Sequence, residues 1–344
     1  MKGKKLLIGA IALFIGFTVA AQDKADFTPS GKVNGKVFFN YHYDMSKGTE
    51  KESSFEIKRA YFGYDYSIAK GLKASITLDV DKNDGGSDYT VFLKKAQLEW
   101  KASSAVKVSL GMIGTVQFSD QESFWGYRYI MKSFNDEYGF GSSADLGIKA
   151  NFKLSDSFSA NAFVINGEGY KKVQDEDGKQ KVGASLLYQN KGLIAKVYAD
   201  ANTTTVVGEG GSEEDVTVTA LATFVGYKFS EKFRLAAEYN QLINGTKYSS
   251  AADNHDLEGM SVYSTYTFDK KWEVFGRYDY LTSNTLQGET EKWNLSKNGS
   301  AITAGVQYAP AKGVKMAFNY QGFMKKESAS NDNSMVYVNF EFKF

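Results

Sequence analysis

The chain has 344 residues, no cysteine and two prolines, and its 41 Lys and Arg nearly balance 40 Asp and Glu. The lack of cysteine excludes disulfides, thiolate metal sites and a cysteine nucleophile, and the balanced charge gives no reason to expect nucleic acid as a partner. Two histidines, His42 and His255, are too few for a multi-histidine metal centre, so we expect no cofactor. Aromatic residues are 15% of a chain that is only 42% hydrophobic. This combination suits a sheet with one apolar, aromatic face and one polar face.

The N-terminus has the order of a secretory signal peptide. Three lysines in the first five residues precede an uncharged apolar run at 6–20, and Ala21 is a small residue suited to cleavage. A transmembrane anchor would need about 20 apolar residues, so a cleaved signal peptide over 1–21 is favoured over an anchor. The mature chain is then expected to begin at Gln22, and residues 22–344 to form a single exported domain.

The mature chain repeats segments of about ten residues in which apolar and polar side chains alternate. In 72–81, for example, Ala74, Ile76, Leu78 and Val80 share one face, and the intervening residues are polar or charged. This period of two predicts strands, because a helix would scatter the charges around its surface. The pattern within 55–66 changes phase near Arg59, which indicates a bulge or an extra turn. Sixteen strands are predicted, near 32–43, 54–66, 72–81, 89–100, 106–113, 143–153, 158–166, 181–189, 193–201, 215–229, 233–243, 257–268, 272–280, 300–308, 314–323 and 334–344.

The predicted connections alternate between short and long along the whole chain. The long polar ones are 44–53, 82–88, 114–142, 167–180, 202–214, 244–256, 281–299 and 324–333. Short periplasmic turns and longer external loops are typical of bacterial outer-membrane barrels. No linker or blade-length repeat supports a soluble β-sandwich or propeller. The sequence therefore predicts an all-β fold, a transmembrane antiparallel β-barrel of about 16 strands.

The end of the chain carries a resemblance of its own. Apolar residues alternate from Val336 to the terminal Phe344, and this run resembles the C-terminal signal of outer-membrane β-barrel proteins. The resemblance implies that Phe344 is an assembly signal read by the barrel-assembly machinery.

Four segments in the first half resemble the phosphate-selective porin O/P family: 55–63, 96–100, 110–112 and 117–138. Together they span about residues 32–153. The resemblance implies a sixteen-stranded, commonly homotrimeric porin with its third loop folded into the pore. The chain departs from the family pattern in carrying Lys58-Arg59 where phosphate-specific members tend to have paired arginines. Its alternating strand faces also show no dense basic ladder.

The third connection, residues 113–142, is the longest and is rich in aromatic residues. Loops of this length are usually functional or disordered, so an infolded constriction is favoured over an external loop that packs on the rim or on a neighbouring subunit. A barrel of sixteen strands leaves an aqueous channel, and charged rings set the selectivity of such pores. The predicted pore-lining and selectivity residues are Arg59, Lys73, Asp79, Lys107, Arg128, Lys132, Lys149, Arg234, Arg277 and Lys315. For any single one of them, a solvated lumen residue or half of an ion pair is favoured over a role in selectivity.

Together these patterns predict a porin in the outer membrane of a Gram-negative bacterium. It would pass small hydrophilic solutes and ions by diffusion, with at most a modest preference for anions such as phosphate, and its partners would be outer-membrane lipids. No nucleophile elbow or phosphate-binding glycine loop supports an enzyme. His42 is expected in an interfacial aromatic girdle and His255 in a solvated loop. The alternative is a non-channel barrel, either an enzyme or a structural or adhesion protein that acts through exposed loops such as 202–214.

Overall fold

A computed structural model of the protein describes residues 27–46, 48, 50–82, 89–174, 176–207, 211–325 and 332–344. The predicted signal peptide and the expected cleavage point lie outside these residues. In the described part of the chain, no helix is long and apolar enough to cross a membrane.

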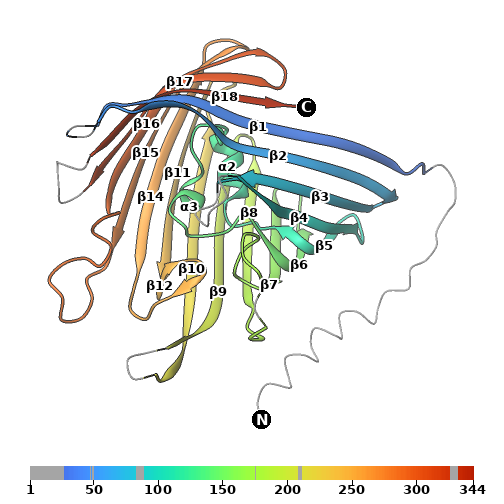
Figure 1. Ribbon diagram of the computed structural model, residues 1–344. Helices are drawn as coiled ribbons and strands as arrows, with labels where there is room; N and C mark the ends of the chain where they lie inside the picture. Colours follow the sequence, from blue (N-terminus) through green and yellow to red (C-terminus); the bar gives the residue numbers. More distant parts are fainter. Residues whose placement is uncertain are drawn as a thin grey trace.

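Sixteen antiparallel strands close into one barrel (Figure 1). They are β1 (Ser30–Asp44), β2 (Ser53–Ala69), β3 (Leu72–Asp81), β4 (Thr90–Lys101), β5 (Val106–Gly114), β6 (Ala144–Lys153), β7 (Phe158–Ile165), β8 (Lys181–Asn190), β9 (Leu193–Val207), β10 (Glu213–Lys228), β11 (Phe233–Ile243), β14 (Leu257–Thr267), β15 (Trp272–Ser283), β16 (Gly299–Ala311), β17 (Val314–Lys325) and β18 (Asn333–Lys343). Each strand pairs with its neighbours in the chain, and β1 pairs with β18. The predicted barrel of about sixteen strands is confirmed.

The alternation in the sequence separates a lipid-facing surface from a polar lumen. On β3, Ile76 is 46% exposed on the outer surface, whereas Asp79 points inward and is fully buried. Exposed aromatic side chains gather near the short turns, where Trp272 packs on Tyr308 with ring centroids 4.5 Å apart. An apolar band edged by aromatic residues is the surface that an outer-membrane barrel presents to lipid.

The prediction of a loop at 202–214 is wrong for most of that segment. Strand β9 continues to Val207 and β10 begins at Glu213, so the two strands project from the barrel as a hairpin (Figure 1). The segment looked like a loop because it is polar, but it is rich in threonine, and β-branched residues favour strands. The Thr203 and Thr217 hydroxyls hydrogen-bond across the hairpin at 2.9 Å. A second small sheet, β12 (Gly245–Lys247) with β13 (Ser250–Ala251), lies in the connection after β11.

Two β-bulges flank β3. The register between β1 and β2 shifts so that Lys58 is an extra residue beside Arg59, as the phase change in the sequence indicated. The register between β3 and β4 shifts in the same way at Lys94, beside Lys95. A bulge places one extra residue against the partner strand, so two consecutive side chains keep to one face. Here the face is the lumen, and each bulge turns two adjacent basic residues inward.

Candidate functional site

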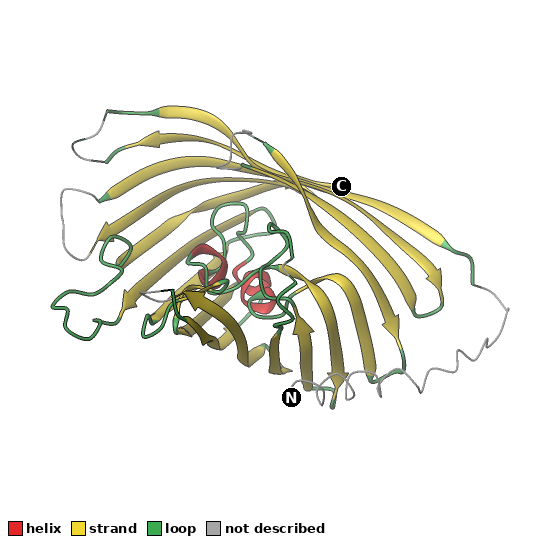
Figure 2. Cartoon of the chain, turned by 60° about the horizontal axis from the view of Figure 1, so that its bottom comes forward, coloured by secondary structure: helices red, strands yellow, loops and turns green. Residues whose placement is uncertain are grey.

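The third connection lies inside the barrel. It joins β5 to β6 and carries two short helices, α2 (Ser119–Trp125) and α3 (Phe134–Glu137). Figure 2 shows both helices, in red, within the ring of strands. Trp125 is 1% exposed and Phe134 is fully buried, which requires contact with the inner wall. We call residues 115–143 the third loop.

One face of the third loop packs on the inner wall through aromatic side chains. Phe124 lies 5.8 Å from Phe224 of β10, and Trp125 lies 5.3 Å from Tyr263 of β14, between ring centroids. Tyr127 lies 4.4 Å from Phe275 of β15 in the same way. Aromatic pairs in this range add stabilisation beyond the area they bury. The loop therefore closes this side of the lumen through aromatic packing.

Hydrogen bonds hold the same face of the loop. The Tyr127 hydroxyl donates to Glu273 at 2.8 Å, and the Tyr129 hydroxyl donates to Gln307 at 2.9 Å. The Asn135 amide donates to Glu238 at 3.1 Å. On the opposite flank, Lys196 of β9 forms an ion pair with Asp120 at 2.7 Å and also donates to the Val116 carbonyl. The loop is thus fixed to strands from β9 to β16.

Three predicted pore-lining residues anchor the loop. Arg277 forms a 2.6 Å ion pair with Asp279 and donates to the Lys132 carbonyl at 2.5 Å. Arg234 donates to the Trp125 carbonyl at 3.4 Å, and Lys315 donates to the Gly126 carbonyl at 3.3 Å. These cations lie between the wall and the loop backbone. We assign their charge to holding the loop.

The opposite face of the loop is polar and partly exposed. Arg128 forms ion pairs with Glu122 at 3.1 Å and with Asp136 at 3.3 Å. The Lys132 side chain is half-buried, and Glu137 is exposed. Arg59 and Tyr61 of β2 are among the electrostatic neighbours of Arg128. This face is therefore directed toward the wall of β2 to β4.

That wall carries the four inward basic residues of the two bulges. Arg59 forms ion pairs with Asp79 at 3.1 Å and with Asp81, and Lys94 lies 3.8 Å from Asp79. Lys58 donates to the carbonyl of Ile130 at the tip of the third loop, at 2.7 Å. We call the region between this wall and the polar face of the loop the aperture.

Further basic residues follow on the short-turn side of the aperture. Lys149 of β6 donates to the Gly114 carbonyl, and a Cβ atom on Gly114 would lie 3.5 Å from the Lys95 ammonium. Two lysines thus converge where the third loop begins. Nearer the short turns, Lys107 pairs with Glu99 at 3.2 Å. Lys73 pairs with Asp65, also at 3.2 Å.

Sequence reasoning missed Lys58, Lys94 and Lys95. With strict alternation, one residue of Lys58-Arg59 and one of Lys94-Lys95 would point outward. Strict alternation therefore predicts no dense row of basic residues on the lumen faces of these strands. The lumen wall of β2 and β4 is more basic than that pattern indicated. The signal is present in the sequence, because the outward apolar series steps by three from Ile57 to Ala60 and again from Leu93 to Ala96.

The expected position of His42 in the aromatic girdle is also wrong. Tyr41 and Tyr43 point to the outer surface, so the histidine between them points into the lumen. Its ring nitrogens lie 3.2 Å from the Asn40 side chain and 3.3 Å from the Ser54 hydroxyl. Among the described residues, no group of three or more His, Cys, Asp or Glu side chains is arranged to hold a metal ion.

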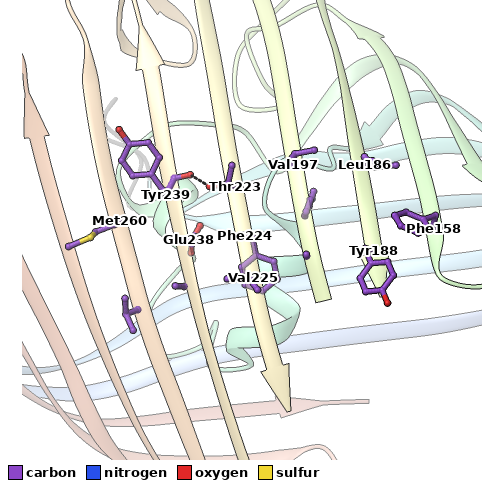
Figure 3. A pocket seen from close by; sticks show the side chains of 14 residues that line it. Phe158, Leu186, Tyr188, Val197, Thr223, Phe224, Val225, Glu238, Tyr239 and Met260 are labelled. Atoms are coloured by element: carbon purple, nitrogen blue, oxygen red, sulfur yellow. Dashed lines mark hydrogen bonds between the residues drawn. The ribbon is translucent and has the colours of Figure 1, made fainter. Parts of the chain in front are cut away.

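A groove of about 520 Å³ lies on the outer surface, over strands β7 to β14 (Figure 3). Its lining includes four side chains that are exposed on the outside of the barrel and one, Tyr188, that is half-buried. The four exposed ones are Phe158, Val225, Tyr239 and Met260. An apolar groove on the outer surface of a membrane barrel faces lipid. It is separate from the polar aperture in the lumen.

Comparison with known families identifies the chain. The profile of a family described as "Putative beta-barrel porin-2, OmpL-like" matches residues 140–344, which is more than half of the sequence. The chain belongs to this family of β-barrel porins. The match spans β6 to β18, whereas the resemblance to the phosphate-selective porin O/P family rests on residues 32–153. The chain is therefore an outer-membrane porin.

Solved structures share the fold at low sequence identity. The outer-membrane channel DcaP of Acinetobacter baumannii aligns with a TM-score of 0.69 at 13% identity, over 94% of this chain and 99% of that one. OmpF of Salmonella typhi, in complex with daunomycin, gives 0.69 at 15%, over 91% and 97%. An anion-selective porin from Comamonas acidovorans gives 0.66 at 15%, over 92% and 100%. No curated protein sequence matches the chain.

Proposed function

We propose that this porin is a water-filled channel for passive diffusion of small hydrophilic solutes, and that the aperture is its narrowest part. The main evidence for this proposal is the difference between the two faces of the third loop. One face is sealed against the wall by aromatic packing around Trp125. The other presents partly exposed charges, such as Arg128 and Glu122, to a charged wall. Water and solutes follow the polar side, because charged side chains there keep the gap hydrated.

Conductance in a planar lipid bilayer tests this proposal directly. Purified mature protein is expected to insert and give stepwise increases in KCl current, and liposomes that contain it should swell in isotonic sugar solutions. Correctly folded protein that gives neither current nor swelling would favour a structural or adhesion barrel, or a barrel enzyme. Heat-modifiable migration on gels establishes folding in the same preparation.

A modest anion preference is the second part of the proposal. Among the described residues around the aperture, four cations have no ion-pair partner, namely Lys58, Lys95, Lys132 and Lys149. The acids without such a partner are two, Glu137 in the third loop and Asp145 at the start of β6. Paired groups largely cancel, and charges on the external loops are screened within about 8 Å at physiological salt. The sign of the reversal potential under a KCl gradient measures this preference. Inhibition of chloride current by added phosphate tests the phosphate specificity that the sequence resemblance implies.

The homotrimer implied by the resemblance belongs to the same proposal. The outer surface is apolar around the barrel, so each copy is embedded in membrane lipid or in contact with another copy. Crosslinking of the protein in native outer membranes should yield a band at three times the monomer mass. A monomer band alone would contradict the trimer but leave the channel proposal intact.

A further inference from the structure

A second connection also enters the lumen. The residues after β7, from Gly167 to Lys171, form a strap across the inner face of β4 to β6. Both Gly167 and Gly169 donate their backbone N–H groups to one Asp145 oxygen, at 3.0 and 3.1 Å. The Tyr170 N–H donates to the Ala144 carbonyl at 3.1 Å. These bonds fix the start of the strap to the first two residues of β6, Ala144 and Asp145.

The side chain of Tyr170 then reaches the wall of β3 and β4, which bounds the aperture. Its hydroxyl donates to Asp79 of β3 at 2.5 Å, and its ring lies 4.9 Å from the Lys94 ammonium. The next residue, Lys171, forms an ion pair with Asp81. The backbone at Tyr170 is bonded to β6, which is three positions from β3 in the barrel, or about 14 Å of wall at the usual strand spacing. The Tyr170 side chain thus lies over the inner face of the barrel between β6 and β3.

Close packing leaves the strap little freedom to move aside. A Cβ atom at Gly169 would lie 2.7 Å from the Ser142 hydroxyl of the third loop and 2.8 Å from the Tyr248 hydroxyl, and Gly169 has a φ of +83°. Only glycine combines that conformation with such close neighbours. Burial and then the Asp79 carboxylate raise the pKa of Tyr170, so the phenol remains a neutral hydrogen-bond donor.

We propose that Tyr170 is a specificity-determining residue of the channel, which limits the size of admitted solutes by narrowing the aperture on its external side. This inference rests on the proposed channel function. The third loop closes the lumen from β9 to β16, and the strap covers the inner face of β4 to β6. Solutes must then pass between Tyr170, Arg128 and the bulged wall of β2 to β4. The phenol ring is the part of this boundary contributed by neither the third loop nor the wall.

Liposome swelling with sugars of increasing size tests the proposal. Tyr170→Ala should admit larger sugars than the wild type, whereas Tyr170→Phe, which keeps the ring, should retain the wild-type size limit. Tyr188→Ala is the matched control, because Tyr188 faces the membrane beside Phe158 and should leave the limit unchanged. If Tyr170→Ala does not yield folded barrel, Tyr170→Val makes the same test with a larger residue.

The outcomes separate this inference from the proposed function. Wild-type protein that admits no sugar and carries no current refutes the channel itself. Wild-type protein that admits sugars, with the same size limit in folded Tyr170→Ala, refutes the role of Tyr170 and leaves the channel intact. A Tyr170→Phe variant that behaves like Tyr170→Ala would assign the effect to the hydroxyl and its bond to Asp79, which also overturns a limit set by the ring.

Discussion

Replacing Trp125 with alanine should release the third loop from the inner wall far more often than in the wild type. Trp125 is 1% exposed, and its ring packs between Tyr263 at 5.3 Å and Phe275 at 5.9 Å. Truncating a buried tryptophan to alanine costs about 3–5 kcal/mol. Since 1.4 kcal/mol is a factor of ten, the undocked fraction of the loop should rise by about 10²- to 4 × 10³-fold. The remaining anchors, such as Arg277 on the Lys132 carbonyl, keep the docked state predominant.

A thiol at Ser133 reports the undocked fraction. The chain has no cysteine, and Ser133 is 2% exposed. Its hydroxyl has no hydrogen-bond partner among the described residues, so Ser133→Cys removes no bond. A charged thiol reagent then labels the cysteine only when the loop is undocked, at a rate proportional to that fraction. In the Trp125→Ala background the labelling rate should rise by two orders of magnitude or more, roughly in line with the energy above. Single-channel records should show brief excursions to higher conductance.

Trp272→Ala is the matched control. Trp272 is 43% exposed on the outer surface and packs on Tyr308, so its loss should affect neither labelling at position 133 nor conductance. Equal labelling rates in the Trp125→Ala and wild-type backgrounds, both with folded barrel, would refute the anchoring role assigned to the aromatic contact.

Three further predictions concern charge, assembly and processing. Replacing Lys95 and Lys149 together with glutamate should move the reversal potential toward cation selectivity, because both ammonium groups lie beside the aperture without an acidic partner; an unchanged potential would place them off the path. Deleting Phe344 should reduce folded barrel in cells but not in purified detergent refolding, because its ring is 66% exposed and its proposed role is recognition; equal yields in cells would contradict that role. Intact mass of protein from outer membranes should correspond to a chain that begins at Gln22, and a mass that retains residues 1–21 would exclude cleavage there.

The barrel could be predicted from the sequence because its strands are governed by local rules. Alternation sets which side chains face lipid, and turn residues set where each strand ends. Strand β3 therefore matches its predicted range of 72–81 without change. The hairpin of β9 and β10 was missed because a polar strand beyond the membrane has no apolar face to mark it. Strand content there depends on pairing with a partner, which a single segment does not reveal.

The site was less predictable, because its contacts join residues far apart in the sequence. The length and aromatic content of the third loop pointed to a role in the lumen. They did not indicate that Arg277, 145 residues beyond Lys132, would donate to its carbonyl. Nor did the segment after β7 carry a signal that Tyr170 would contact Asp79. Both contacts depend on closure of the barrel, which brings distant strands to face one another.

The two bulges follow from a conflict that the sequence itself contains. Without a bulge, adjacent residues on a membrane strand face opposite sides, so one residue of Lys58-Arg59 and one of Lys94-Lys95 would point into lipid. A lysine or arginine there costs about 2–4 kcal/mol at the bilayer midplane and less near its edges. Each bulge removes that penalty by turning both charges toward the lumen. In exchange, one residue of the strand is left without a partner in the hydrogen-bond ladder. Adjacent basic residues in an otherwise alternating membrane strand therefore predict a bulge, and here two such pairs flank Asp79 and Asp81 with more positive charge than these acids neutralise.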